Sequence, residues 1–149
     1  MCGICGAVWT DSGHALSEPE LAAMTARLAH RGPDDAGFHF DRHAAFGFRR
    51  LSIVDLEASR QPLSNEDGSI WVVFNGEIYN YQALRRRLEA RGHTLKTHGD
   101  TEVLVHLYED EGVEMFKHLR GMFALAIWDA PRNTLVLARD RLGQKPLIY

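Results

Sequence analysis

The 149-residue chain lacks the features on which several protein classes depend. Its two cysteines are too few for a disulfide scaffold, and no asparagine stands in an N-x-[ST] glycosylation acceptor. No apolar run approaches the roughly 18 residues of a membrane span, and the start lacks the basic and apolar regions of a secretory signal. A net charge of −3 gives no general attraction to nucleic acid or membranes. These absences predict a cytoplasmic protein that binds neither nucleic acid nor membranes.

What the chain does have is ordinary globular composition, with 45% hydrophobic and 25% charged residues, enough for one domain around one core. The periodicity of apolar residues predicts strands near both ends of the chain and helices between them, which favours α+β layers. The expected strands cover 3–9, 37–50 as a hairpin pair, 70–74, 121–129 and 134–140, and the expected helices cover 17–28, 81–92 and 100–112.

The N-terminal stretch MCGICG contains a C-x-x-C pair, Cys2 and Cys5. As a redox pair it is poorly placed, because no strand or helix start precedes it to lower the thiol pKa. As half of a zinc site it needs a second pair, and the H-x4-H pair His93 and His98 lies far beyond zinc-finger spacing. Cys5, inside the apolar strand, is better explained as a small core residue.

Cys2 also fits a third role, that of an N-terminal nucleophile. Removal of Met1 requires a small next residue, and it would leave Cys2 with both a thiol and a free α-amine. An unperturbed α-amine has a pKa of about 7.7–8.0, so it can serve as the general base for its own thiol. On this residue alone, an accidental cysteine at a chain end remains an alternative.

The remaining motifs favour the nucleophile. The chain contains, in order, MCGICG (1–6), HRGPD (30–34), RRLSIVD (49–55), QPL (61–63), FNGEIYNY (74–81), GDTE (99–102), GMFALAIWD (121–129) and ARDRLGQKPL (138–147). Together these motifs resemble the glutaminase domain of asparagine synthetase, a class II glutamine amidotransferase of the N-terminal-nucleophile type. The resemblance covers residues 1–149 and implies a four-layer αββα sandwich with two antiparallel sheets between helices.

The resemblance implies a catalytic set of Cys2, Asn75 and Gly76. Asn-Gly is also the commonest hairpin turn, but the sequence that follows Gly76 is typical of a turn into a helix. An Asn side-chain amide beside a glycine N–H can form an oxyanion hole, and the resemblance implies that role here.

The resemblance also implies a glutamine-binding set. Arg50, rather than Arg49, would bind the α-carboxylate, since a guanidinium can hold a carboxylate through two hydrogen bonds. Asp100 and, more weakly, Glu77 would face the α-ammonium. The alternative for Asp100 is a helix N-cap, and for Glu77 an acidic residue in a first helical turn. The other implied pocket residues are Leu51, Ser52, Ile53 and Val54, besides Asn75 and Gly76.

The implied reaction is hydrolysis of the glutamine side-chain amide, with no metal or organic cofactor in this half. ATP and Mg²⁺ are expected only in a C-terminal synthetase domain absent from this chain, where ammonia would aminate aspartate or another carboxylate. A homodimer is left open, as are two rivals: a non-catalytic glutamine-binding module that retains Met1, and a reversible dithiol of Cys2 and Cys5. HRGPD is expected near the glutamine site, without assigned roles for His30, Arg31 and Gly32.

Overall fold

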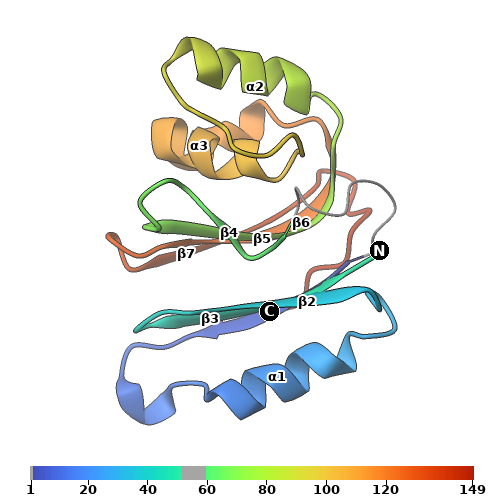
Figure 1. Cartoon of the computed structure of the whole chain (residues 1–149), viewed down its shortest axis with the longest axis vertical. Coiled ribbons are helices and arrows are strands. Elements are labelled where there is room, and N and C mark those ends of the chain that lie inside the picture. The colour runs from blue at the N-terminus through green and yellow to red at the C-terminus, as the bar shows by residue number, and fades with distance from the viewer. Residues whose placement is uncertain (1, 52–59) are drawn as a thin grey trace.

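The computed structural model describes residues 2–51 and 60–149 as four stacked layers (Figure 1). Helices α2 and α3 cover the sheet of β4 to β7, and the sheet of β1 to β3 faces its other side. Helix α1 covers the outer side of the β1–β3 sheet. Every pairing in both sheets is antiparallel. The predicted αββα sandwich is therefore confirmed.

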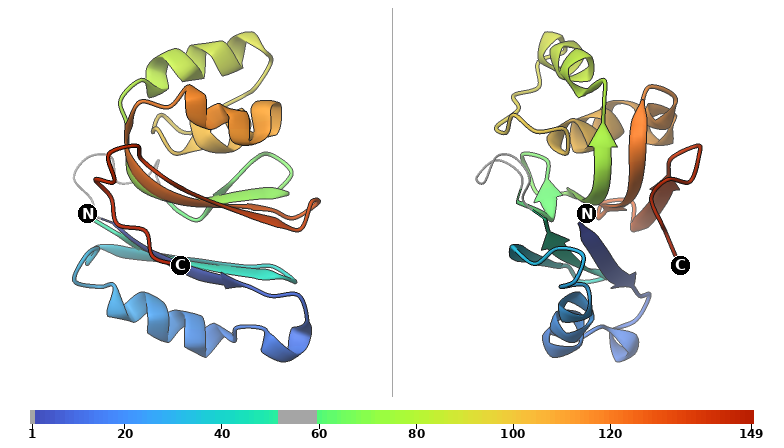
Figure 2. Two further views of the ribbon diagram at one scale, coloured as in Figure 1. Left: turned by 180° about the vertical axis from the view of Figure 1, so that it is seen from behind. Right: turned by 90° about the vertical axis from the view of Figure 1, so that its right-hand side faces the viewer.

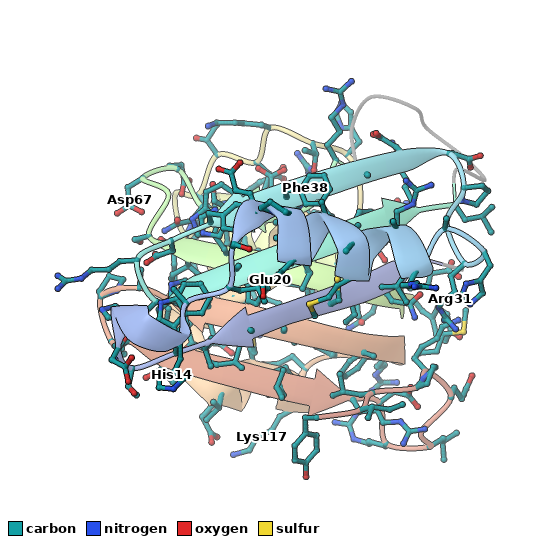
Figure 3. The ribbon with its side chains drawn as sticks, turned by 90° about the horizontal axis from the view of Figure 1, so that it is seen from below. His14, Glu20, Arg31, Phe38, Asp67 and Lys117 are labelled. Carbon is teal, nitrogen blue, oxygen red and sulfur yellow. The ribbon has the colours of Figure 1, made fainter. Side chains whose placement is uncertain are left out.

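The first sheet in chain order has the strand order β1-β3-β2 and carries α1 on its outer face (Figure 3). The helix begins after Ser17, whose N–H donates to the carboxylate of Glu20 at 2.9 Å, as the predicted capping box requires. The elements of this half are β1 (Gly3–Val8), the 3-10 turn η1 (Ser12–His14), α1 (Glu18–Arg27), β2 (Asp35–Phe40) and β3 (Ala44–Arg50).

The second sheet in chain order has the strand order β4-β5-β6-β7 and packs against α2 and α3. Sequence patterns located all its elements except the two-residue β4 and the 3-10 helix η2, both too short to show a period. The elements are β4 (Leu63–Ser64), β5 (Ile70–Ile78), α2 (Tyr81–Ala90), α3 (Glu102–Glu111), η2 (Gly112–Lys117), β6 (Gly121–Asp129) and β7 (Thr134–Arg139).

Two hydrophobic clusters hold the layers together. The larger fills the space between the β4-β5-β6-β7 sheet and its helices, and includes Leu104 and Leu107, both fully buried. The smaller joins the two sheets through Phe46, Val73 and Trp128, among others. None of the helices in the described part of the chain is long and apolar enough to cross a membrane.

The hairpin-turn alternative for Asn75-Gly76 is wrong. Both residues lie inside β5, opposite Ala124 and Phe123 of β6. A Cβ on Gly76 would stand 2.2 Å from the carbonyl oxygen of Met122, so only glycine allows the two strands this approach. Long-range pairing with β6 overrides the local turn preference of the dipeptide.

Candidate active site

A cavity of about 710 Å³ opens where β1 begins and β5 ends. Figure 2 shows the start of β1 at the level between the two sheets, and β1 contacts β5 of the other sheet. The cavity is lined by every described residue of the predicted site: Cys2, Arg50, Leu51, Asn75, Gly76, Glu77 and Asp100. Ser52, Ile53 and Val54 lie outside the described residues, so their predicted part in the pocket stays a prediction.

The pleat of β1 separates the two cysteines. Cys2, just before the strand, packs with Ile4 on the cluster between the sheets. Cys5 points toward α1, where its Sγ lies 3.4 Å from the hydroxyl of Thr25. Both thiols are free, and burial raises the pKa of Cys5, which disfavours its thiolate. Cys5 is therefore a half-buried packing residue under α1 rather than the small core residue that was predicted, and its direction away from Cys2 argues against a dithiol.

Arg31 connects the loop after α1 to the backbone of Cys2. Its Nε donates to the carbonyl oxygen of Cys2 at 3.2 Å, and Figure 3 shows Arg31 beyond the C-terminal end of α1. Sequence reasoning assigned no role to this residue. The structure gives it one contact that restrains the position of Cys2.

Arg49 and Arg50, at the end of β3, go to different places. Arg49 donates from Nε to the carbonyl of Gly32 at 2.7 Å and from Nη2 to that of Pro33 at 3.0 Å. Arg50 is 5% exposed and lines the cavity. Neighbouring side chains on a strand face opposite sides, so Arg50 faces the cavity and Arg49 does not, while carboxylate binding by Arg50 stays a prediction.

Asp100 is not the N-cap of α3, because Thr101 holds that position. The carboxylate of Asp100 instead accepts the Ile78 N–H at 2.9 Å. Burial raises the pKa of Asp100, the Ile78 hydrogen bond opposes that shift, and nearby Glu77 adds to it. Glu77 itself is exposed at the cavity rim, at the end of β5 rather than in a helix. The capping alternative for Asp100 is therefore wrong.

Gln61 is a site residue to which sequence reasoning gave no role. Its side-chain oxygen accepts the Phe74 N–H at 2.6 Å, and its amide nitrogen donates to the Thr101 hydroxyl at 3.4 Å. Phe74 precedes Asn75, and Thr101 follows Asp100. One buried amide thus links the strand that carries Asn75 to the loop that carries Asp100, which the motif QPL alone could not indicate.

The cavity carries both signs of charge. Arg50 and Lys145 line it with cationic side chains, and Asp100 and Glu77 with carboxylates. The backbone N–H of Lys145 donates to the carboxylate of Asp140 at 3.0 Å, which fixes the position of Lys145. Such a lining suits a zwitterion, with a thiol and an Asn amide available at the same cavity for its uncharged end.

The glutamine amidotransferase domain family model matches residues 1–149, and the chain belongs to this family. Among solved structures, it is similar to the glutamine phosphoribosylpyrophosphate amidotransferase of Bacillus subtilis, with a TM-score of 0.57 and 29% identity over 70% of this chain and 24% of that one.

Within the family, the chain is similar to glutamine-hydrolysing asparagine synthetases. It is 48% identical to asparagine synthetase 1 of Bacillus subtilis over 98% of its own length, and 46% identical to asparagine synthetase 2 of the same organism over 100%. It spans only 24% and 20% of those two proteins. The predicted resemblance to this enzyme family is confirmed.

Proposed function

We propose that the chain hydrolyses the side-chain amide of L-glutamine through a thioester on Cys2 and supplies the released ammonia to an ATP-dependent synthetase. One observation carries this proposal: Cys2, just before β1 of one sheet, and Asn75-Gly76, in β5 of the other sheet, line one cavity. Membership in the glutamine amidotransferase family supports the same reaction.

The first half-reaction forms the thioester. After Met1 is removed, the free α-amine of Cys2 takes the thiol proton, and Sγ adds to the amide carbon of glutamine. The carbonyl oxygen becomes an oxyanion, which accepts hydrogen bonds from the Asn75 side-chain amide and the Gly76 N–H. The ammonium of Cys2 then protonates the leaving nitrogen, the C–N bond breaks, and ammonia departs.

The second half-reaction returns the enzyme to its starting state. The same amine deprotonates a water, which adds to the thioester carbon. Collapse of this second tetrahedral intermediate breaks the C–S bond, releases glutamate, and returns the proton to the thiol. No step requires a metal or an organic cofactor.

The two charges of the substrate's α-carbon select for an amino acid. Arg50 binds the α-carboxylate and Asp100 the α-ammonium, with Glu77 adding negative charge at the rim. Leu51 lines the same cavity, and the part of Ser52, Ile53 and Val54 in the pocket stays a prediction. This arrangement places the reactive amide at the far end of the substrate, toward Cys2.

The acceptor of the ammonia is proposed from the relatives. Their names indicate asparagine synthesis, so aspartate is the proposed acceptor, activated by ATP and Mg²⁺ in a synthetase domain of the same protein. Another carboxylate is the alternative acceptor, and a homodimer and a cytoplasmic location remain predictions.

Paired cysteine variants test the proposed function. Cys2→Ala should abolish glutamate release while the thermal unfolding midpoint stays near that of the parent chain, because the side chain is catalytic. Cys5→Ala is the matched control, and it should retain substantial activity. Glutamate release by Cys2→Ala, or an equal loss of activity in both variants, would contradict the assignment of Cys2 as the nucleophile. A folded parent chain that binds glutamine without hydrolysing it would instead indicate a binding module.

A further inference from the structure

A second cluster of reactive side chains stands apart from the glutamine cavity. Glu66, His93 and His106 each offer a ligand atom, and these atoms lie within 4.8 Å of one another. Within this cluster, His106 Nδ1 and Glu66 Oε2 are 3.5 Å apart. None of the three lines the glutamine cavity as the described residues define it.

The fold gives His93 a different partner from the one considered in the sequence. Its H-x4-H neighbour His98 is exposed and lines the glutamine cavity, whereas the rings of His93 and His106 lie 4.9 Å apart between centroids. Glu66 comes from the turn between β4 and β5, His93 from the connection between α2 and α3, and His106 from α3. Three segments distant in sequence therefore meet at one point.

His106 is unusual for a buried side chain. It is 1% exposed, and its Nε2 has no hydrogen-bond partner among the described residues, although Glu102 Oε1 lies 3.8 Å away. Its Nδ1 lies 2.9 Å from Glu109 Oε2. This buried imidazole therefore directs Nδ1, an atom that can ligate a metal ion, toward carboxylate oxygens of Glu66 and Glu109.

Further negative charge surrounds the cluster. Asp110 Oδ1 lies 3.0 Å from His93 Nε2, so carboxylates approach both imidazoles. Arg91 offsets part of this charge by pairing with Asp110 at 2.8 Å. Two imidazoles with carboxylate oxygens form a donor set that suits Zn²⁺ and neighbouring first-row divalent ions rather than Mg²⁺ or Ca²⁺.

We propose that Glu66, His93 and His106 bind a divalent transition-metal ion. The ion would draw the ligand atoms inward to coordination distance and cross-link the β4–β5 turn, the α2–α3 connection and α3. Its effect would be on stability, since the amide hydrolysis proposed for Cys2 does not use it.

Zinc titration of the Cys2→Ala chain tests this proposal, because that background removes the cavity thiol as a competing ligand. After treatment with a chelator, the chain should bind one equivalent of Zn²⁺ by calorimetry, and its thermal unfolding midpoint should rise. His93→Ala, at a half-buried position, and Glu66→Gln, at an exposed one, should each weaken Zn²⁺ binding at least about tenfold and diminish the thermal shift.

The matched control is His14→Ala. His14 Nδ1 pairs with Asp11 Oδ1 at 3.0 Å, the same separation as the His93–Asp110 pair, but it lies on the 3-10 turn before α1 (Figure 3). This variant should bind Zn²⁺ as tightly as the Cys2→Ala chain. The proposal is overturned if the Cys2→Ala chain shows no saturable Zn²⁺ binding, or if His93→Ala and Glu66→Gln bind as the control does.

Discussion

Replacing Asp100 by asparagine separates its hydrogen bond with Ile78 from the ammonium-binding role proposed for it. Asparagine has nearly the same shape, and its side-chain oxygen can still accept the Ile78 N–H that Asp100 accepts at 2.9 Å. What the substitution removes is the negative charge. We therefore expect glutamine binding to weaken while the loop before α3 keeps its position.

The effect on binding follows from the loss of a charged hydrogen-bond partner for the substrate ammonium. Such bonds contribute about 1.5–3 kcal/mol, and each 1.4 kcal/mol is about tenfold in affinity. The KM for glutamine should therefore rise about ten- to 150-fold, with a much smaller change in kcat. An analogue with an acylated α-amine carries no ammonium, so the variant and the parent chain should handle it equally well.

Although Asp100→Asn should weaken glutamine binding, it should stabilise the folded chain. Burial raises the pKa of Asp100 in the folded chain above its ordinary value. Folding therefore favours the protonated form of Asp100. Its contribution to the free energy of unfolding is fully present below the ordinary Asp pKa of about 3.9 and is lost as pH rises through the raised folded pKa. Because an asparagine side chain is neutral at every pH, Asp100→Asn should unfold at a higher temperature than the parent at pH 7. This difference should shrink as the pH falls toward the ordinary value.

The assays are glutamate release against glutamine concentration and calorimetric unfolding, each over a pH series. Glutamine binding by the parent should weaken as pH falls through the raised pKa of Asp100, and Asp100→Asn should lack that dependence. Asp67→Asn, at an exposed carboxylate outside the cavity, should leave KM unchanged. A parent-like KM in Asp100→Asn, or a lower unfolding temperature at pH 7, would refute the assignment.

Variants at three further residues examine the rest of the cavity. Asn75→Ala should lower kcat by about two to three orders of magnitude, as for one lost oxyanion donor, and an effect confined to KM would make it a ground-state contact. Arg50→Ala should raise KM for glutamine strongly but matter little for an analogue with an amidated α-carboxylate; equal loss for both substrates would count against carboxylate binding. Gln61→Met should leave the Phe74 N–H unpaired, lower the unfolding free energy measured in urea by about 1–3 kcal/mol and reduce kcat/KM, whereas Gln61→Glu keeps the acceptor and should recover part of the stability. Unchanged stability and kinetics in Gln61→Met would show that the amide links nothing of consequence.

The sequence predicted the layers well because their signals are local. Leu104 and Leu107 mark one face of α3, and Ser17 with Glu20 marks the start of α1. The position of Asn75-Gly76 inside a strand was not predictable in this way, because it depends on pairing with β6, which lies far along the chain beyond α2, α3 and η2.

The site shows the same division. The family resemblance predicted that Cys2, Arg50 and Asp100 belong to one site, and these described residues do line one cavity. The bridge made by Gln61 and the pairing of His93 with His106 depend on contacts between segments far apart in sequence. No spacing rule in a single sequence reports such contacts.

The central claim is that processed Cys2 is the nucleophile, and a single sample can test it through intact mass and glutamate release. Rapid acid quenching during glutamine turnover should trap a glutamyl adduct, and peptide mapping should place it on Cys2 of chains that have lost Met1. The glutaminase rate should scale with the fraction of processed chains. Full activity in chains that retain Met1, or an adduct on any other residue, would contradict the account.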